Sequence, residues 1–405
     1  MFAQPKLTIC VPSRNRQRYL QETIRSFLVN MRMDVEYIFA DNSDDASIMQ
    51  DFMVDIVDDP RVKFLPPAER VLSMVDNWER CLEVATGEFV CVIGDDDYVD
   101  PDVADLIARL QREKPGVEAI AWTRLVYRWP DYRPHKCVVG IPMGNYYASI
   151  PRSMIYKDFF SWSTNGDKPN CIFSVYHGAV SLEMMKKIRK KFNGRFFEHP
   201  VVDFENSCKL LVTAQNFVHV ERPFSVMGAC IESNSGRAHD AKRLKDMHAQ
   251  FMSEIGRDID KDAYMKDFPF PIFLGNTAAI AMCQQWFKHT YGYKAPDGWQ
   301  KNFVRACALS CGGTQENFDH FVAGYRAAIE AWEGGVHLES FDPQMKDTSR
   351  DVLFFGVLGT KLYVDEDIAD VATPAEFFHV VNQMIVPLDQ MEGVSIEEAA
   401  ARQAA

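Results

Sequence analysis

The sequence lacks the long apolar run that a membrane-spanning helix requires. No stretch approaches about 20 consecutive apolar residues, and residues 1–6 lack the basic and apolar segments of a signal peptide. A surplus of basic residues is also missing, because the formal net charge is −13. Nucleic-acid binding depends on clustered lysine and arginine, so nucleic acid is not an expected partner. We expect a cytoplasmic protein without a transmembrane segment, and peripheral attachment to the inner membrane stays open.

Paired cysteines are absent as well. The chain holds 10 cysteines without any CxxC pair, and Cys10, Cys91 and Cys208 lie within apolar runs. This distribution is typical of reduced, buried thiols and offers no zinc-ligand spacing. Apolar residues make up 47% of the 405 residues and charged residues 25%, which is typical of a globular protein with a packed core. The length suits one large domain with an appendage, or two domains.

Short apolar runs alternate with helix-period segments over the first 125 residues. This alternation predicts a mostly parallel sheet covered by helices. The expected strands are residues 7–11, 35–40, 61–65, 88–94 and 117–122. Residues 126–172 lose this periodicity, so we expect long loops or a sheet edge there. Beyond about residue 240 the pattern is helical.

Three polar clusters follow the ends of expected strands. They occupy residues 12–16 after the first strand, 41–43 after the second and 94–97 after the fourth. The loops at the carboxyl ends of strands in an open parallel sheet converge on the ligand site. The sequence therefore predicts one binding site built from these three loops.

Asp95, Asp96 and Asp97 are the sharpest chemical signal. Three adjacent carboxylates repel one another unless a cation or a bound proton compensates their charge. Hard divalent ions prefer oxygen ligands, and Mg²⁺ is commonly held by one or two carboxylates together with substrate phosphates. A solvated acidic turn is the structural alternative, but the position at a strand end favours a site for Mn²⁺ or Mg²⁺.

These clusters resemble the inverting glycosyltransferases of family 2, which have the GT-A fold. The resemblance is strong over residues 6–125, through segments 11–16, 41–43, 85–89 and 94–101. It continues weakly to residue 234, through segments 176–178, 194–197 and 222–225, which are similar to bacterial polysaccharide-type members. The resemblance does not extend beyond residue 240.

The resemblance implies an α/β fold with a GT-A, Rossmann-like nucleotide-diphospho-sugar transferase domain over residues 1–238. Its first half, to residue 125, would bind the nucleotide sugar, and residues 126–238 would bind the acceptor. A mostly helical C-terminal region would follow over residues 239–405. We expect this region to bind the acceptor or to form a homodimer.

The resemblance also implies roles for single residues. The nucleotide pocket is expected from Pro12, Ser13, Arg14, Asn15, Asp41, Asn42 and Asp95. Asp96 stands where the family keeps its principal metal-binding aspartate, and Asp97 is the second expected metal ligand. Gly94 stands where many members keep the first aspartate of an Asp-x-Asp motif. Asp95 could replace that aspartate, so the division of work among the three acids stays open.

Transfer of a sugar from a nucleoside diphosphate builds negative charge on the leaving diphosphate, which a cation stabilises. An inverting enzyme also needs a carboxylate general base on the opposite side of the sugar. We assign this role to Asp203, because the family's catalytic acid usually lies in such a segment. Asp203 could instead cap the helix expected from residue 204, and Glu198 and Glu205 are rival bases.

Other polar residues have structural explanations. His177 is expected to be a buried structural group, and Trp78 a core residue. Arg14 and Arg16 could either neutralise phosphate or be solvated. Residues 233–237 contain glycine and serine, so this loop could close over the donor.

Together these features predict metal-dependent, inverting transfer of a sugar from a nucleoside-diphosphate donor, with a UDP-sugar favoured, to a glycan or glycolipid hydroxyl. A sugar nucleotidyltransferase is a weaker alternative, because residues 12–16 contain no glycine for a phosphate loop. A catalytically inactive scaffold that binds sugar nucleotides or glycans is another, although the intact aspartate triplet argues against it.

Overall fold

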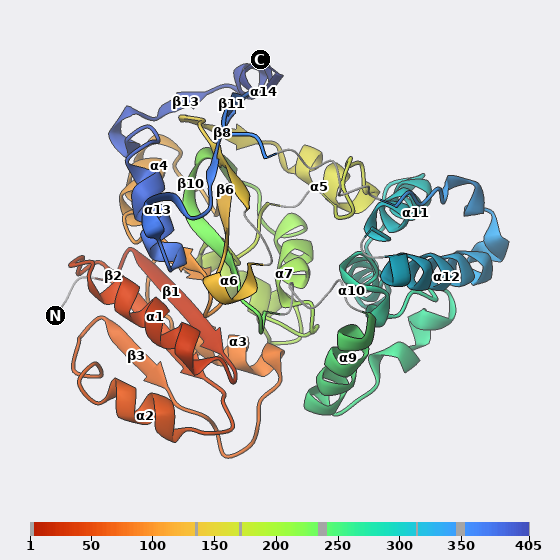
Figure 1. Ribbon diagram of the computed structural model, residues 1–405, viewed down its shortest axis with the longest axis horizontal. Coiled ribbons are helices and arrows are strands. Elements are labelled where there is room, and N and C mark those ends of the chain that lie inside the picture. The colour runs from red at the N-terminus through yellow and green to blue at the C-terminus, as the bar shows by residue number, and fades with distance from the viewer. Residues whose placement is uncertain are drawn as a thin grey trace.

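The computed structural model describes residues 4–133, 137–169, 172–233, 241–312, 315–345 and 353–404. These residues form a 10-stranded sheet in the order β13-β8-β10-β6-β9-β4-β1-β2-β3, with β5 paired to β10 (Figure 1). The strands of the first 100 residues are β1 (Leu7–Ser13), β2 (Val35–Asp41), β3 (Val62–Leu65), β4 (Phe89–Val92) and β5 (Tyr98–Val99), of which β5 joins the second half of the sheet through β10. Strands β1 to β4 run parallel, so the predicted α/β fold with a parallel first half is confirmed.

The second half of the sheet is mixed. Its strands are β6 (Ala119–Arg128), β8 (Tyr146–Ile150), β9 (Gly178–Ser181), β10 (Phe217–Ala229) and β13 (Glu392–Val394). Strand β9 runs antiparallel between β4 and β6, while β10 runs parallel to β6. The region 126–172, where the sequence pattern is weak, thus contributes a strand of this sheet, and it also holds β7 (Val138–Pro142) and α5 (Arg152–Ser161).

Helices cover both faces of the sheet. Side chains of β1 point alternately to the two faces, and both faces are apolar, so each must be shielded from water by a layer of helices. Ile9 packs in one cluster and Cys10 in the other. The first face is covered by α1 (Gln17–Leu28), α2 (Ser47–Met53), α4 (Val103–Glu113) and α13 (Pro374–Asn382). The second face carries α3 (Met74–Val84), α6 (Leu182–Lys191) and α7 (Val202–Leu211).

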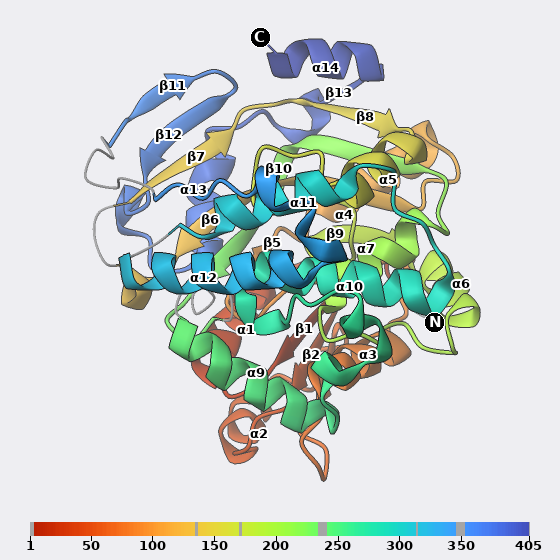
Figure 2. The same ribbon diagram turned by 90° about the vertical axis from the view of Figure 1, so that its right-hand side faces the viewer.

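The C-terminal region adds a helical layer to the second face. This layer consists of α9 (Ala241–Ile255), α10 (Asn276–Tyr291), α11 (Trp299–Ser310) and α12 (Gln315–Ala331). Figure 1 shows these helices gathered on one side of the molecule, and Figure 2 looks onto α10, α11 and α12 in front of the sheet. Their apolar residues join the same cluster as α3 and α7.

Residues 353–404 return to the sheet. A small second sheet joins β11 (Gly356–Leu358) and β12 (Lys361–Asp365) to β7, β13 pairs with β8, and α14 (Ile396–Ala404) ends the described chain. The region beyond residue 240 is mostly helical, as expected, but these strands are not indicated by the sequence pattern. The boundary near residue 238 stays a prediction. Among the described residues, no helix is long and apolar enough to cross a membrane.

Candidate active site

A cavity of about 730 Å³ lies where the polar loops of the sheet meet. Strands β2 and β3 lie on one side of β1, and β4 lies on the other, so the chain reverses its direction across the sheet between β1 and β4. Open α/β sheets bind ligands at the carboxyl ends of the strands at this switch point. The cavity is lined there by residues of the β1 loop, the β2 loop and the acidic turn, among them Ser13, Asn42 and Asp96.

Asp95 is fully buried. The hydroxyl of Ser13 donates to Asp95 Oδ2 at 2.5 Å, and Arg16 Nη2 lies 2.7 Å from Oδ1. Burial raises the pKa of Asp95 to about 7, against the opposing charge of Arg16. Thr23 Oγ1 donates to the backbone carbonyl of Asp95 at 2.7 Å, which anchors the turn to α1. Asp95 therefore lies beneath the cavity surface and is not among the described residues that line the cavity.

Asp96 is the acid of the triplet that lines the cavity. Arg16 Nη1 is 3.4 Å from its Oδ1, while Oδ2 is buried and has no hydrogen-bond partner among the described residues. Burial raises the pKa of Asp96, with Arg16 opposing that shift. A buried carboxylate oxygen with free lone pairs is suited to a divalent cation, so the donor set fits Mn²⁺ or Mg²⁺ at Asp96.

Asp97 is buried and has its carboxylate saturated by four donors. Backbone N–H groups of Gly94 and Gly228 donate at 2.7 Å, Tyr176 Oη at 2.8 Å, and His177 Nε2 lies at 2.9 Å. Burial acts to raise its pKa, but the charge and hydrogen bond of His177 hold the pKa of Asp97 below its ordinary value. The expected metal role of Asp97 stays a prediction, and in this structure its oxygens hold the turn together.

The charge of the triplet is partly compensated from within the chain. Arg16 pairs with Asp95 and Asp96 and is not the solvated side chain that was the alternative, while its contact with a phosphate stays a prediction. His177 is fully buried and bridges Asp97 to Ser225, whose Oγ lies 2.9 Å from Nδ1, so its structural role is confirmed. A divalent ion is therefore not needed to make three adjacent acids tolerable. The support for a metal is the free oxygen of Asp96.

Pro12, Ser13, Arg14, Asn15 and Asn42 line the cavity, as predicted for the nucleotide pocket. Asn15 has a positive φ of 54°, and its side chain donates to Asp44 Oδ2 and accepts the backbone N–H of Asp44, which ties the β1 loop to the β2 loop. Asn42 makes hydrogen bonds to both backbone groups of Leu72.

Asp41 differs from these residues. Its side chain is fully buried, Oδ1 accepts the N–H of Ser43 at 3.0 Å, and it is not among the described cavity-lining residues. Burial raises the pKa of Asp41, and the Ser43 hydrogen bonds oppose this shift. Contact between Asp41 and a base or ribose stays a prediction that requires movement of this side chain.

Asp203 lines the cavity from the first turn of α7. The residue at the helix cap is Val201, so the alternative of Asp203 as the helix cap is wrong. Burial raises the pKa of Asp203, while backbone N–H groups and the cations Arg124 and Lys168 act in the opposite direction. Both cations also line the cavity.

The two rival acids are engaged elsewhere. Glu205 is fully buried, pairs with Lys209 Nζ at 2.6 Å and accepts the backbone N–H groups of Glu198 and His199. Glu198 pairs with the same Lys209 nitrogen at 2.8 Å and accepts the hydroxyl of Tyr291. Neither acid is among the described residues around the cavity. Asp203 is thus the acid of this segment that faces the site.

Helix α9 forms a wall of the cavity that the sequence pattern does not indicate. Its contributing residues are Leu244, Met247, His248, Gln250, Phe251 and Glu254. Glu254 lies 3.3 Å from Arg14, which links the wall to the β1 loop. The sequence pattern shows the helical period of this segment, but it does not show that the helix packs beside the β1 loop.

Trp78 packs against Tyr176 and Phe197 as expected for the core and also borders the cavity. Of the expected closing loop, Ser233 lines the cavity, and residues 234–237 lie outside the described residues.

The sequence of this region matches a known family. Residues 8–176 match the model of Glycosyl transferase family 2. A 96-residue segment is 35% identical to the GalNAc(5)-diNAcBac-PP-undecaprenol beta-1,3-glucosyltransferase of Campylobacter jejuni. That match covers 23% of this chain and 30% of the relative, so the chain spans less than a third of the relative's length.

Two solved structures are similar over most of the chain. S. aureus TarS 1-349 in complex with UDP-GlcNAc has 13% identity and a TM-score of 0.44, covering 83% of this chain and 89% of its own. Mannosyltransferase PcManGT from Pyrobaculum calidifontis, in complex with GDP-Man and Mn²⁺, has 14% identity and a TM-score of 0.38, covering 84% and 85%. These structural similarities are weak, and the assignment depends on the family match and on the observed sheet. The region that holds β1 to β4 and the acidic turn is thus similar in sequence to Glycosyl transferase family 2.

Proposed function

We propose that the protein transfers a sugar from a nucleoside-diphosphate donor to an acceptor hydroxyl with inversion, assisted by Mn²⁺ or Mg²⁺. The observation that carries this proposal is the placement of Asp96 and Asp203 in the wall of one cavity at the switch point of the sheet. One acid offers a free oxygen for a cation, and the other offers a base.

The charge around the cavity suits a diphosphate. Arg14, Arg16, Arg124 and Lys168 all line it, although Arg14 and Arg16 also pair with acids of the chain. A bound divalent ion at Asp96 would neutralise the leaving diphosphate. The loop of residues 12–15 and Asn42 would hold the nucleotide.

Asp203 would take the proton of the acceptor hydroxyl. Its raised pKa brings its basicity closer to neutral pH, where a general base is most effective. We assign Asp97 a supporting role, because its four donors fix the acidic turn.

A UDP-sugar is our favoured donor and a glycan or glycolipid our favoured acceptor. The name of the Campylobacter jejuni relative includes an undecaprenol-linked glycan, which supports a glycolipid. We infer that residues beyond 239 contribute to the acceptor site through α9. Homodimer formation would be tested by light scattering of the full chain, and a cytoplasmic or membrane-peripheral location by cell fractionation.

Calorimetric titration with nucleoside diphosphates, followed by a transfer assay with a panel of donors, tests the proposal. Asp96→Asn is expected to remove the binding that depends on Mn²⁺, while Asp203→Asn keeps that binding and loses transfer by about 100-fold or more. The matched control is Glu69→Gln, which changes an exposed acid that lies outside the cavity lining. Wild-type binding without turnover would favour the scaffold, and pyrophosphate release from a nucleoside triphosphate would favour a nucleotidyltransferase.

A further inference from the structure

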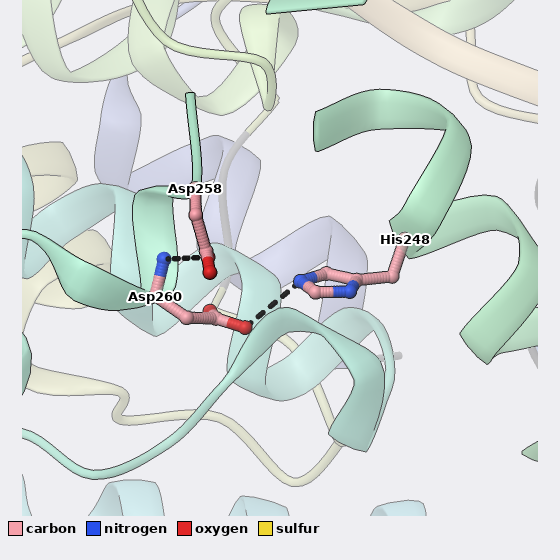
Figure 3. A group of neighbouring side chains, drawn as sticks. All are labelled: His248, Asp258 and Asp260. Atoms are coloured by element: carbon pink, nitrogen blue, oxygen red, sulfur yellow. Dashed lines mark hydrogen bonds and ion pairs between the residues drawn. The ribbon is translucent and has the colours of Figure 1, made fainter. Parts of the chain in front are cut away.

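Three metal-ligating side chains gather beside the wall formed by α9. His248 lies in α9 and lines the cavity, while Asp258 and Asp260 come from the turn that follows, around the short helix η2 (Ile259–Lys261). One ligand atom from each residue lies within 4.8 Å of the other two. Figure 3 shows the three side chains pointing toward one another.

The contact between His248 and Asp260 is close but unsatisfied. Nε2 of His248 lies 2.8 Å from Oδ2 of Asp260, yet this nitrogen is buried and makes no hydrogen bond of good alignment within the described ranges. The other oxygen of Asp260, Oδ1, is also buried without a partner there. Two ligands that are each roughly 2.1 Å from one tetrahedral cation lie about 3.4 Å apart, so these two atoms would separate by roughly 0.6 Å when an ion binds. A small movement of these side chains would therefore let them share a cation, and the buried atoms that lack a hydrogen bond are the ones available to hold it.

Asp258 is oriented toward the same space. Its Oδ1 accepts the backbone N–H of Asp260 at 3.1 Å, the kind of hydrogen bond that fixes a ligating carboxylate. Lys261 lies 3.1 Å from Oδ2, but its side chain is 82% exposed and can turn into water. One imidazole with two carboxylates suits a transition-metal ion such as Zn²⁺ better than Mg²⁺.

We propose that His248, Asp258 and Asp260 form a second divalent-metal site, separate from the acidic turn, that takes a transition-metal ion such as Zn²⁺. The ion would join α9 to the turn after it. Because α9 also holds Glu254 against Arg14, the site would fix the wall of the cavity. The proposal is independent of the sugar-transfer function.

The test measures zinc bound per chain by mass spectrometry after equilibration with Zn²⁺ and gel filtration. Absorption of the Co²⁺-loaded protein then reports the ligand geometry. The double variant His248→Gln/Asp260→Asn is expected to lose one zinc per chain and the Co²⁺ band. Asp96→Asn, and Asp267→Asn as an exposed control, should keep both.

Circular dichroism checks that the double variant is folded, and the single variant Asp258→Asn provides a milder change with an expected loss of zinc affinity of at least about tenfold. Zinc that stays bound in both variants, or that is lost only with Asp96→Asn, would overturn the proposal. A wild-type chain that retains no zinc would overturn it as well. A failure of sugar transfer would leave these metal measurements unaffected.

Discussion

The close packing of β10 against the acidic turn leads to a sharp prediction for Gly228→Ala. A Cβ atom at this position would lie 1.6 Å from the backbone oxygen of Asp96 and 2.6 Å from its carbonyl carbon. Ordinary contact requires the strand or the turn to move by roughly 1.5 Å. The turn carries the acid that faces the cavity, so the substitution should disturb both stability and binding.

The magnitude follows from the contacts at stake. Overpacking a close contact costs about 1–3 kcal/mol. The movement also strains two buried hydrogen bonds, from Gly228 N–H to Asp97 Oδ1 at 2.7 Å and from Trp129 Nε1 to the carbonyl of Asp96 at 2.9 Å. Each contributes about 1 kcal/mol, so the free energy of unfolding should fall by about 3 kcal/mol in total.

Thermal unfolding and calorimetric titration check this prediction. The melting temperature should fall by about 3–4 °C, and metal-dependent nucleotide affinity by at least about tenfold, because displacement of about 1 Å in a site is costly. Gly166→Ala is the matched control, since its Cβ would meet only Thr164 Oγ1, at an ordinary 3.6 Å. A Gly228→Ala protein with the stability and affinity of Gly166→Ala would refute the reasoning.

Three further predictions concern the acids of the fold. Gly94→Asp, which restores the family's usual residue, should destabilise the chain and leave metal affinity no higher in titrations, because its Cβ would lie 2.9 Å from Asp97 Oδ2. Burial raises the pKa of Asp95 to about 7 in the folded protein, whereas an aspartate in the unfolded chain has a pKa of about 4. The resulting stabilisation of the fold is complete below about pH 4 and is lost as the pH rises through 7. Urea unfolding of Asp95→Asn should therefore show a smaller decline between pH 4 and 8, and an unchanged slope would contradict this assignment. Lys209→Met leaves Glu205 buried and unpaired, so unfolding free energy should fall by about 3–5 kcal/mol, with partial recovery on adding Glu205→Gln.

Local sequence patterns predicted much of the fold. Ile9 and Cys10 alternate into two clusters because successive strand residues face opposite sides, and this period of two is legible along β1. The polar clusters at the strand ends also pointed to the cavity, since parallel strands bring equivalent ends together. Of the residues predicted for the nucleotide pocket, the β1 loop and Asn42 lie there.

Partners distant in sequence could not be read in this way. Asp97 receives hydrogen bonds from His177 and Gly228, which lie 80 and 131 residues further along the chain. Nothing near Asp97 in the sequence shows that its oxygens are occupied while Asp96 keeps one free. The family's motif identifies the turn, but the tertiary contacts determine which of its acids can bind a ligand.

The sequence by itself determined the alternating α/β order, the position of the acidic turn and the match of residues 8–176 to Glycosyl transferase family 2. Tertiary structure alone decided that Arg16 compensates Asp95 and Asp96, that α9 walls the cavity, and that residues 353–404 return to the sheet. The physical reason is the separation along the chain over which each interaction acts. Side-chain periodicity and turn chemistry act between near neighbours, whereas burial and charge pairing depend on which distant segments the folded core brings together.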